Sequence, residues 1–211
     1  MIPPTAKEID GVENIYRSSA ALEVIARNTL KSYNPALIGG QPSAVPIEKL
    51  ARHLGLSIEY QCLRKTGWLL GEMVYDRTYV PVYFRDLKRY GLIIVEGRTI
   101  ILDESLLDGD NDGRLRFTCA HEIAHWLLHR ELYTGTGQAA AFINLKKSSE
   151  ENPAVEKQAN KLATLLLMPT VQVKLAFYTA RNSTDPAASL SGLFEVSKQA
   201  MRIFLREHNL T

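Results

Sequence analysis

The sequence has few cysteines, almost no net charge and no long hydrophobic segment. Its 211 residues include two cysteines, Cys62 and Cys119, which could form one disulfide in principle. This count does not suggest the disulfide framework of a secreted protein, and we interpret both as reduced core thiols. The net charge of +2 gives no electrostatic reason to expect nucleic acid binding. No apolar run approaches the roughly 18 residues of a transmembrane helix, so no membrane association is expected.

The N-terminus also lacks a basic segment followed by an apolar one, so no secretory signal is predicted and a cytoplasmic location is expected. With 45% hydrophobic and 23% charged residues, the chain has a globular composition. We expect a flexible N-terminal arm over residues 1–14, a main domain over residues 15–180, and a C-terminal helical segment over residues 181–211 that packs on this domain.

The histidines are unevenly distributed, because three of the five lie within nine residues, at His121, His125 and His129. His121-Glu122-Ile-Ala-His125 matches H-E-x-x-H. Residues four apart share one helical face, so the two imidazoles can bind one Zn²⁺ ion. Glu122 would lie beside that ion and act as the general base. A buried helix can also carry such a pattern by chance and bind nothing.

The surroundings of this pattern favour a metal site. Apolar residues flank it on both sides, so the helix belongs to the core, where imidazoles and a carboxylate are costly without partners. Ala120 and Ala124 are small and allow another segment to approach closely. A third ligand is therefore expected on a second ordered element.

Glu156 is the preferred third ligand, since it opens a strongly helical run with one apolar face. Asn160 lies four residues later on the same face and is predicted to hydrogen-bond a ligand histidine or the Glu156 carboxylate. Alternatively, Glu156 is a solvated glutamate at a helix start, and Asn160 only caps or packs the helix. Glu150 and Glu151 are rivals without an asparagine at that spacing. His129 continues the first helix, which favours a structural role or contact with a ligand.

Together these segments resemble the ImmA/IrrE family of bacterial and phage metallopeptidases. In that family R-F-T-x-A-H-E-x-G-H leads to E-x-x-A-N-x-F-A-x-x-L-L-M-P. The two matching segments here are Phe117–His125 and Glu156–Pro169, and the resemblance extends over about residues 45–205. Ala124 replaces a glycine and Leu162 a phenylalanine, while Phe204 stands where an arginine is common.

The resemblance implies an α+β, zincin-like fold in which a small antiparallel sheet packs on the H-E-x-x-H helix, with a helical C-terminal part. It also implies a zinc-dependent endopeptidase, with one Zn²⁺ ion, that cleaves a helix-turn-helix repressor and relieves repression of a mobile element or stress genes. The alternative is a repressor-binding or toxin-like module with the same fold and no catalysis. The intact Glu122 favours the enzyme.

Hydrophobic periodicity predicts the remaining elements. Helices are expected within residues 15–33 and 46–55, joined by a loop over residues 34–44. Strands are expected at 56–61, 68–74, 79–83, 92–95 and 98–103, and Glu96-Gly97 is a candidate tight hairpin between the last two. Residues 187–208 have the rhythm of a helix-turn-helix with Ser197 as the second cap, but a helical pair packed on the core is favoured, because its exposed cations are few.

Overall fold

The computed structural model describes residues 17–64, 69–108, 112–134, 153–180 and 183–210, so the arm expected at 1–14 lies outside the described residues. Its helices are α2 (Ser19–Tyr33), α3 (Ala36–Gly39), α4 (Ile47–His53), the 3-10 helix η2 (Glu104–Leu107), α5 (Asp112–Tyr133), α7 (Pro153–Leu167), α8 (Thr170–Ala180), α9 (Pro186–Phe194) and α10 (Lys198–Glu207). The strands are β1 (Ser57–Gln61), β2 (Gly71–Val74), β3 (Thr78–Phe84), β4 (Arg89–Val95) and β5 (Thr99–Asp103). The predicted α+β class is confirmed.

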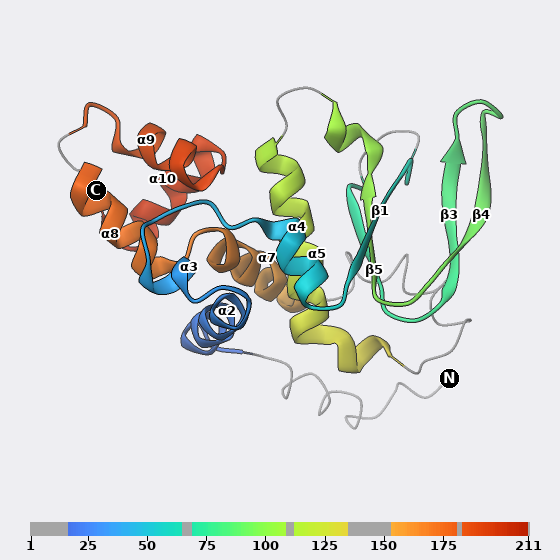
Figure 1. Ribbon diagram of the computed structural model, residues 1–211. Helices are drawn as coiled ribbons and strands as arrows, with labels where there is room; N and C mark the ends of the chain where they lie inside the picture. Colours follow the sequence, from blue (N-terminus) through green and yellow to red (C-terminus); the bar gives the residue numbers. More distant parts are fainter. Residues whose placement is uncertain (1–16, 65–68, 109–111, 135–152, 181–182, 211) are drawn as a thin grey trace, which may run out of the picture.

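The strands form two separate sheets. In the first sheet β5 lies between β1, which is parallel to it, and β2, which is antiparallel. The second sheet is the antiparallel hairpin β3–β4. Figure 1 shows this hairpin as the outermost part of the strand region, away from the helices. The expected small antiparallel sheet is therefore corrected to a mixed sheet with a hairpin beside it.

The predicted hairpin at Glu96-Gly97 is wrong, because the strands on either side of this turn belong to different sheets. All five residues of β5 are buried, as expected of a central strand with neighbours on both edges and cover on both faces. On β4, by contrast, exposed and less exposed residues alternate, as expected of a surface strand. The turn therefore carries the chain from one sheet to the other.

The expected loop at residues 34–44 also needs a correction, since it contains the short helix α3. The side chain of Asn34 accepts a hydrogen bond from the backbone N–H of Ala36, and Leu37 is buried. The predicted helix at 46–55 is confirmed by α4, which has Pro46 as its N-cap. Gly55 follows with a φ of +75°, the left-handed conformation that glycine adopts without strain.

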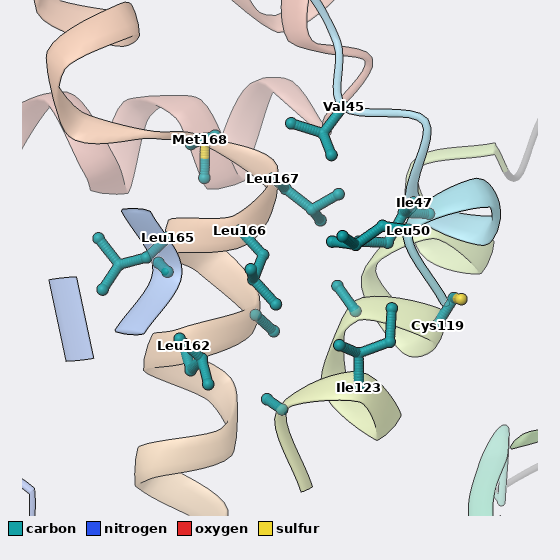
Figure 2. Close-up of a cluster of buried hydrophobic side chains, with 14 of the residues drawn as sticks. Val45, Ile47, Leu50, Cys119, Ile123, Leu162, Leu165, Leu166, Leu167 and Met168 are labelled. Atoms are coloured by element: carbon teal, nitrogen blue, oxygen red, sulfur yellow. The ribbon is translucent and has the colours of Figure 1, made fainter. Parts of the chain in front are cut away.

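The main core lies between α5 and α7, which pack against each other in the middle of the molecule (Figure 1). Four alanines in these helices, Ala120, Ala124, Ala159 and Ala163, are fully buried. Small side chains let two helix backbones approach closely, as predicted for Ala120 and Ala124. Figure 2 shows Leu167, the last residue of α7, pointing toward Val45, Ile47 and Leu50, whereas Leu165 points away from them.

Cys119 belongs to the same core (Figure 2), and Cys62 is also buried, so both are free thiols as predicted. Burial, together with the nearby Glu48 and Glu122, raises the pKa of the Cys119 thiol to about 12. A thiol that stays protonated at neutral pH is a poor metal ligand and a poor nucleophile. Cys119 is therefore a packing residue despite its place in the histidine helix.

The C-terminal helices α9 and α10 pack on the helical core. Leu190, Phe194, Met201 and Phe204 from these helices join the main cluster of buried residues. The Ser197 side chain accepts from the backbone N–H of Ala200, which confirms the predicted cap. Lys198 and Arg202 form ion pairs with Asp185, so these two cations of α10 are already engaged.

α7 ends just before Pro169, where the predicted stop occurs, and α8 begins at Thr170. Within the described ranges no single helix has the length and apolar composition to cross a membrane. The pair α7 and α8 has that length and composition when taken together, but the two helices are bent by 52° at the break between them. The break lets α8 leave the α5–α7 pair and contact α9.

Candidate metal centre and active site

Three predicted ligand residues converge where α5 and α7 face each other. One ligand atom each from His121, His125 and Glu156 lies within 4.8 Å of the other two. The Nε2 atoms of the two histidines are 2.9 Å apart, and the Glu156 carboxylate oxygens lie 3.3 Å and 3.4 Å from them. Among the described residues, no other group of three side chains has this arrangement. Glu150 and Glu151, the rival carboxylates, lie outside the described residues.

This donor set fits a divalent metal ion. Two imidazole nitrogens and one carboxylate oxygen are typical ligands of Zn²⁺, and three protein ligands leave one position of a tetrahedral ion open. The helical spacing of the two histidines points both Nε2 atoms to the same side of α5. The close α5–α7 packing then brings the Glu156 carboxylate within reach from the opposite side.

The charged and polar groups of this cluster shift the pKa values of Glu156 and His121. Burial disfavours ionisation of Glu156, but hydrogen bonds from His121 and His125 outweigh it and lower the pKa of its carboxyl to about 2. Burial also opposes protonation of His121, yet a hydrogen bond to Glu156 and the charge of Glu122 raise its pKa. A carboxylate that stays ionised beside two imidazoles produces a site that attracts a cation.

Glu122 lies next to the cluster and is buried. Burial is the main cause that raises the pKa of its carboxyl, while a hydrogen bond from the backbone of Met73 in β2 opposes the rise. A carboxylate with a raised pKa is better matched to proton transfer near neutral pH than an ordinary one. The structure therefore places the predicted base where β2 meets α5.

Gly71 makes this contact between strand and helix possible, and sequence analysis missed it. A Cβ atom on Gly71 would lie 2.6 Å from Cγ2 of Thr118 and 2.8 Å from Oε1 of Glu122. Any larger residue would push β2 away from Glu122 or displace its carboxylate. A glycine inside a strand is a known signal of close approach, but it does not name the partner.

Tyr75, directly after β2, is a second neighbour that sequence analysis missed. Its ring stacks on Trp126 at 6.2 Å and on Tyr133 at 5.0 Å between centroids. Burial and the charges of Glu122 and Glu156 raise the pKa of its hydroxyl, which stays protonated at neutral pH. Only the fold brings this tyrosine, which is far upstream in the sequence, to the histidine helix.

His129 lies outside the ligand cluster, on the far side of the His125 ring. Its Nδ1 atom is 3.2 Å from Nδ1 of His125, and its side chain is completely buried. Burial, with the neighbouring His125, lowers the pKa of His129 to about 4, so this ring is neutral at physiological pH. His129 therefore contacts a candidate ligand without joining the ligand set.

Asn160 lies one turn after Glu156 and is exposed at the surface of α7. A hydrogen bond that the protonated His121 ring donates to the Asn160 side chain contributes to the raised pKa of His121. Nevertheless, among the residues that the structure describes, no group hydrogen-bonds the buried Nδ1 atom of His121. The predicted role of Asn160, as the hydrogen-bond partner of a ligand histidine or of the Glu156 carboxylate, thus stays a prediction.

Comparison with protein families finds one match that covers both helices of this site. Residues 82–206, more than half of the chain, match the model of a peptidase family described as IrrE N-terminal-like domain. A search of curated protein sequences finds no match. The matched segment begins within β3 and ends within α10, so it includes His121, His125 and Glu156.

Proposed function

We propose a function for this chain on the basis of its family, since it belongs to the peptidase family described as IrrE N-terminal-like domain. The proposal is that the chain is a zinc-dependent endopeptidase whose substrate is a helix-turn-helix transcriptional repressor. The family supports a metallopeptidase with a zincin-like fold. The observation that supports zinc-dependent hydrolysis is the convergence of His121, His125 and Glu156 beside the buried Glu122.

In this proposal the ligands are His121, His125 and Glu156, and Glu122 is the general base. A bound Zn²⁺ ion would polarise the scissile carbonyl and lower the pKa of a coordinated water from 15.7 to about 7. Glu122 takes a proton from the attacking water as the new C–O bond forms. It then returns the proton to the amine nitrogen as the C–N bond breaks.

The position of β2 supports a peptide substrate. In the described part of the chain β2 is an outer strand of its sheet, and its residue Met73 hydrogen-bonds Glu122. An extended peptide can add to such an edge through backbone hydrogen bonds. A peptide lying along β2 would therefore pass directly beside the proposed base and ligands.

The substrate class rests on the family resemblance, which implies release of the genes that such a repressor silences. The test mixes the purified protein with a small helix-turn-helix protein encoded beside its gene and follows cleavage by mass spectrometry. We expect cleavage that stops when a chelator removes the metal. Glu122→Gln should keep the metal, because Glu122 is not a ligand, and cleave about 10²–10⁴-fold more slowly.

Glu131→Gln is the matched control, because Glu131 lies on the same helix and is exposed. It should cleave at the wild-type rate. Normal cleavage by Glu122→Gln would show that Glu122 is not the base. Tight binding of the repressor by the wild-type protein, with no cleavage in the presence of zinc, would instead favour the alternative of a non-catalytic binding module.

A further inference from the structure

The two ring nitrogens of His125 face opposite neighbours. Its Nε2 atom points to the other two candidate ligands and lies 2.9 Å from Nε2 of His121 and 3.4 Å from the Glu156 carboxylate. Its Nδ1 atom points the other way and lies 3.2 Å from Nδ1 of His129. The three histidines of α5 thus form a continuous chain of ring contacts along one face of the helix.

The chemistry of a neutral imidazole restricts what His125 can do at both ends. One ring nitrogen carries a proton and the other carries a lone pair. If Nε2 is to offer its lone pair to a cation, the proton must reside on Nδ1, and a buried N–H needs an acceptor. Nδ1 of His129 lies 3.2 Å from this position, at hydrogen-bonding distance.

We propose that His129 is a positioning residue, which accepts the hydrogen bond of the His125 Nδ1–H group and thereby keeps the Nε2 lone pair directed at His121 and Glu156. The inference rests on the proposed metal centre and adds to it. It assigns the partner that fixes both the tautomer and the ring orientation of one ligand. Helical spacing makes this possible, because His129 follows His125 by one turn on the same face of α5.

A packing role alone accounts poorly for a histidine here. The His129 side chain has an exposed fraction of 0%, and within the described ranges its Nε2 atom has no hydrogen-bond partner. A buried polar atom without a partner is unfavourable, so an apolar ring of similar shape would fill this space better. An apolar replacement should therefore leave zinc affinity unchanged if His129 only packs, and lower it if His129 is the hydrogen-bond partner of His125.

The test measures zinc affinity of the full-length protein by competition with a chromophoric chelator, without any substrate. His129→Phe keeps an aromatic ring but removes the acceptor. We expect it to bind zinc about 10–100-fold more weakly than the wild type, the usual effect of losing such a partner. The melting temperature of the metal-free variant should equal or exceed that of the metal-free wild type, because the buried unpaired nitrogen is gone.

Two further variants separate the hydrogen bond from the shape of the ring. His129→Asn places an amide oxygen near the position of Nδ1 and should restore most of the lost affinity. His208→Phe is the matched control, since His208 stacks on Phe204 at the end of α10 and should not influence zinc binding. Unchanged zinc affinity in His129→Phe, or His129→Asn binding no better than His129→Phe, would overturn the inference.

A spectroscopic measurement on the unaltered sequence is independent of whether any variant folds. In zinc-loaded protein labelled with ¹⁵N-histidine, an N–H···N bond should produce a scalar coupling between Nδ1 of His125 and Nδ1 of His129. Absence of this coupling in a folded, zinc-loaded sample would contradict the inference. A wild-type protein that binds no zinc would instead refute the proposed metal centre, so the two failures are distinguishable.

Discussion

The two faces of the three-stranded sheet differ in what they bury. The face toward α5 meets a helix that buries Glu122, His125 and His129 in addition to apolar residues. On the face toward the β3–β4 hairpin, Val74 and Ile101 of the sheet pack against valines of the hairpin, including Val80 and Val82. Buried titratable groups are costly, so the cluster of Glu122, His125 and His129 on the α5 side marks the candidate site.

The outer surface of the hairpin extends this contrast. The register pairs Tyr79 with Ile94, and Leu92 with Pro81, so that apolar side chains share the face turned away from the sheet. Leu92 and Ile94 are 54% and 52% exposed. Apolar groups that are already in water lose little when they are replaced. The helix face should therefore be sensitive to single substitutions and the hairpin tolerant of them.

The largest difference between the two regions is expected for metal binding. Glu156→Ala removes a ligand carboxylate, and we expect zinc affinity to fall by more than the roughly 10–100-fold effect of losing an outer partner. Leu92→Ala, in the hairpin, should leave the affinity unchanged. Metal analysis after dialysis, with a competition titration, measures both. Undiminished zinc affinity in Glu156→Ala would show that another residue is the third ligand. The two regions would then not differ in their effect on metal binding.

A matched pair of glycines compares the regions directly. A Cβ on Gly71 would meet Thr118 and Glu122 in the buried helix face, whereas a Cβ on Gly91 would meet the ring of Phe84, also at 2.6 Å. Gly71→Ala should cost about 1–3 kcal/mol, as overpacking usually does, and should also slow cleavage. Gly91→Ala should change stability by less than about 0.5 kcal/mol, because Phe84 is exposed and can move away.

Denaturant unfolding of both glycine variants, with cleavage rates for the folded proteins, measures this difference. Equal losses of stability in the two would show that the hairpin is as tightly constrained as the helix face. A Gly71→Ala protein that is destabilised but cleaves normally would show that β2 does not position Glu122.

Glu72 allows the hairpin side of the sheet to be tested through the pH dependence of folding stability. It lies on β2 between Gly71 and Met73, which face α5, so strand alternation turns it toward the hairpin side. Burial, together with the charge of Glu122, raises the pKa of its carboxyl from 4.5 to about 8. Between these pH values the folded protein binds the proton that the unfolded chain releases. Stability should therefore fall as pH rises from about 4.5 to about 8, and level off above that.

Glu72→Gln removes this titration. Because the Glu72 side chain keeps some contact with solvent, we expect the variant to exceed the wild type at pH 8 by only about 1–2 kcal/mol. The two proteins should be equally stable near pH 4, where Glu72 is protonated in both states. Chemical unfolding of the metal-free proteins across this range measures the difference, with Glu131→Gln as an exposed control. Parallel pH profiles for Glu72→Gln and the wild type would contradict the burial of this carboxyl.

The smallest effect is expected at Asn160, which lies on α7 one turn after the candidate ligand Glu156 and is exposed. Asn160→Ala should weaken zinc binding by about 10-fold, the low end of the range for residues that contact a ligand. Its melting temperature without metal should not change. A lower melting temperature with normal zinc affinity would mean that Asn160 only stabilises α7. That result would restrict the sensitive region to buried side chains.

Prediction from sequence was most successful where local spacing determines geometry. His121 and His125 were expected on one face of a helix, and the structure has their Nε2 atoms side by side. The serine cap at Ser197 and the stop before Pro169 also depend on neighbours in the chain. The roles of Glu122, Glu156 and Asn160 stay predictions, although the structure has Glu156 in contact with both histidines.

Prediction failed where the partner of a segment lies far along the chain. The turn at Glu96-Gly97 has the composition of a tight hairpin, yet the strands on its two sides join different sheets. The importance of Gly71 and Tyr75 was invisible, because the residues that surround them come from α5. A local pattern does not specify which distant element will cover it.

The sequence by itself determined which side chains each helix presents together, since 3.6 residues per turn fix the neighbours four positions away. This includes the contact of His125 with His129 as well as the spacing of the two candidate ligands. Only the tertiary structure decided that α7 brings Glu156 to that face, and that β2 approaches closely enough for Met73 to hydrogen-bond Glu122. The physical reason is that these contacts depend on the packing of small residues between distant elements, which no local period encodes.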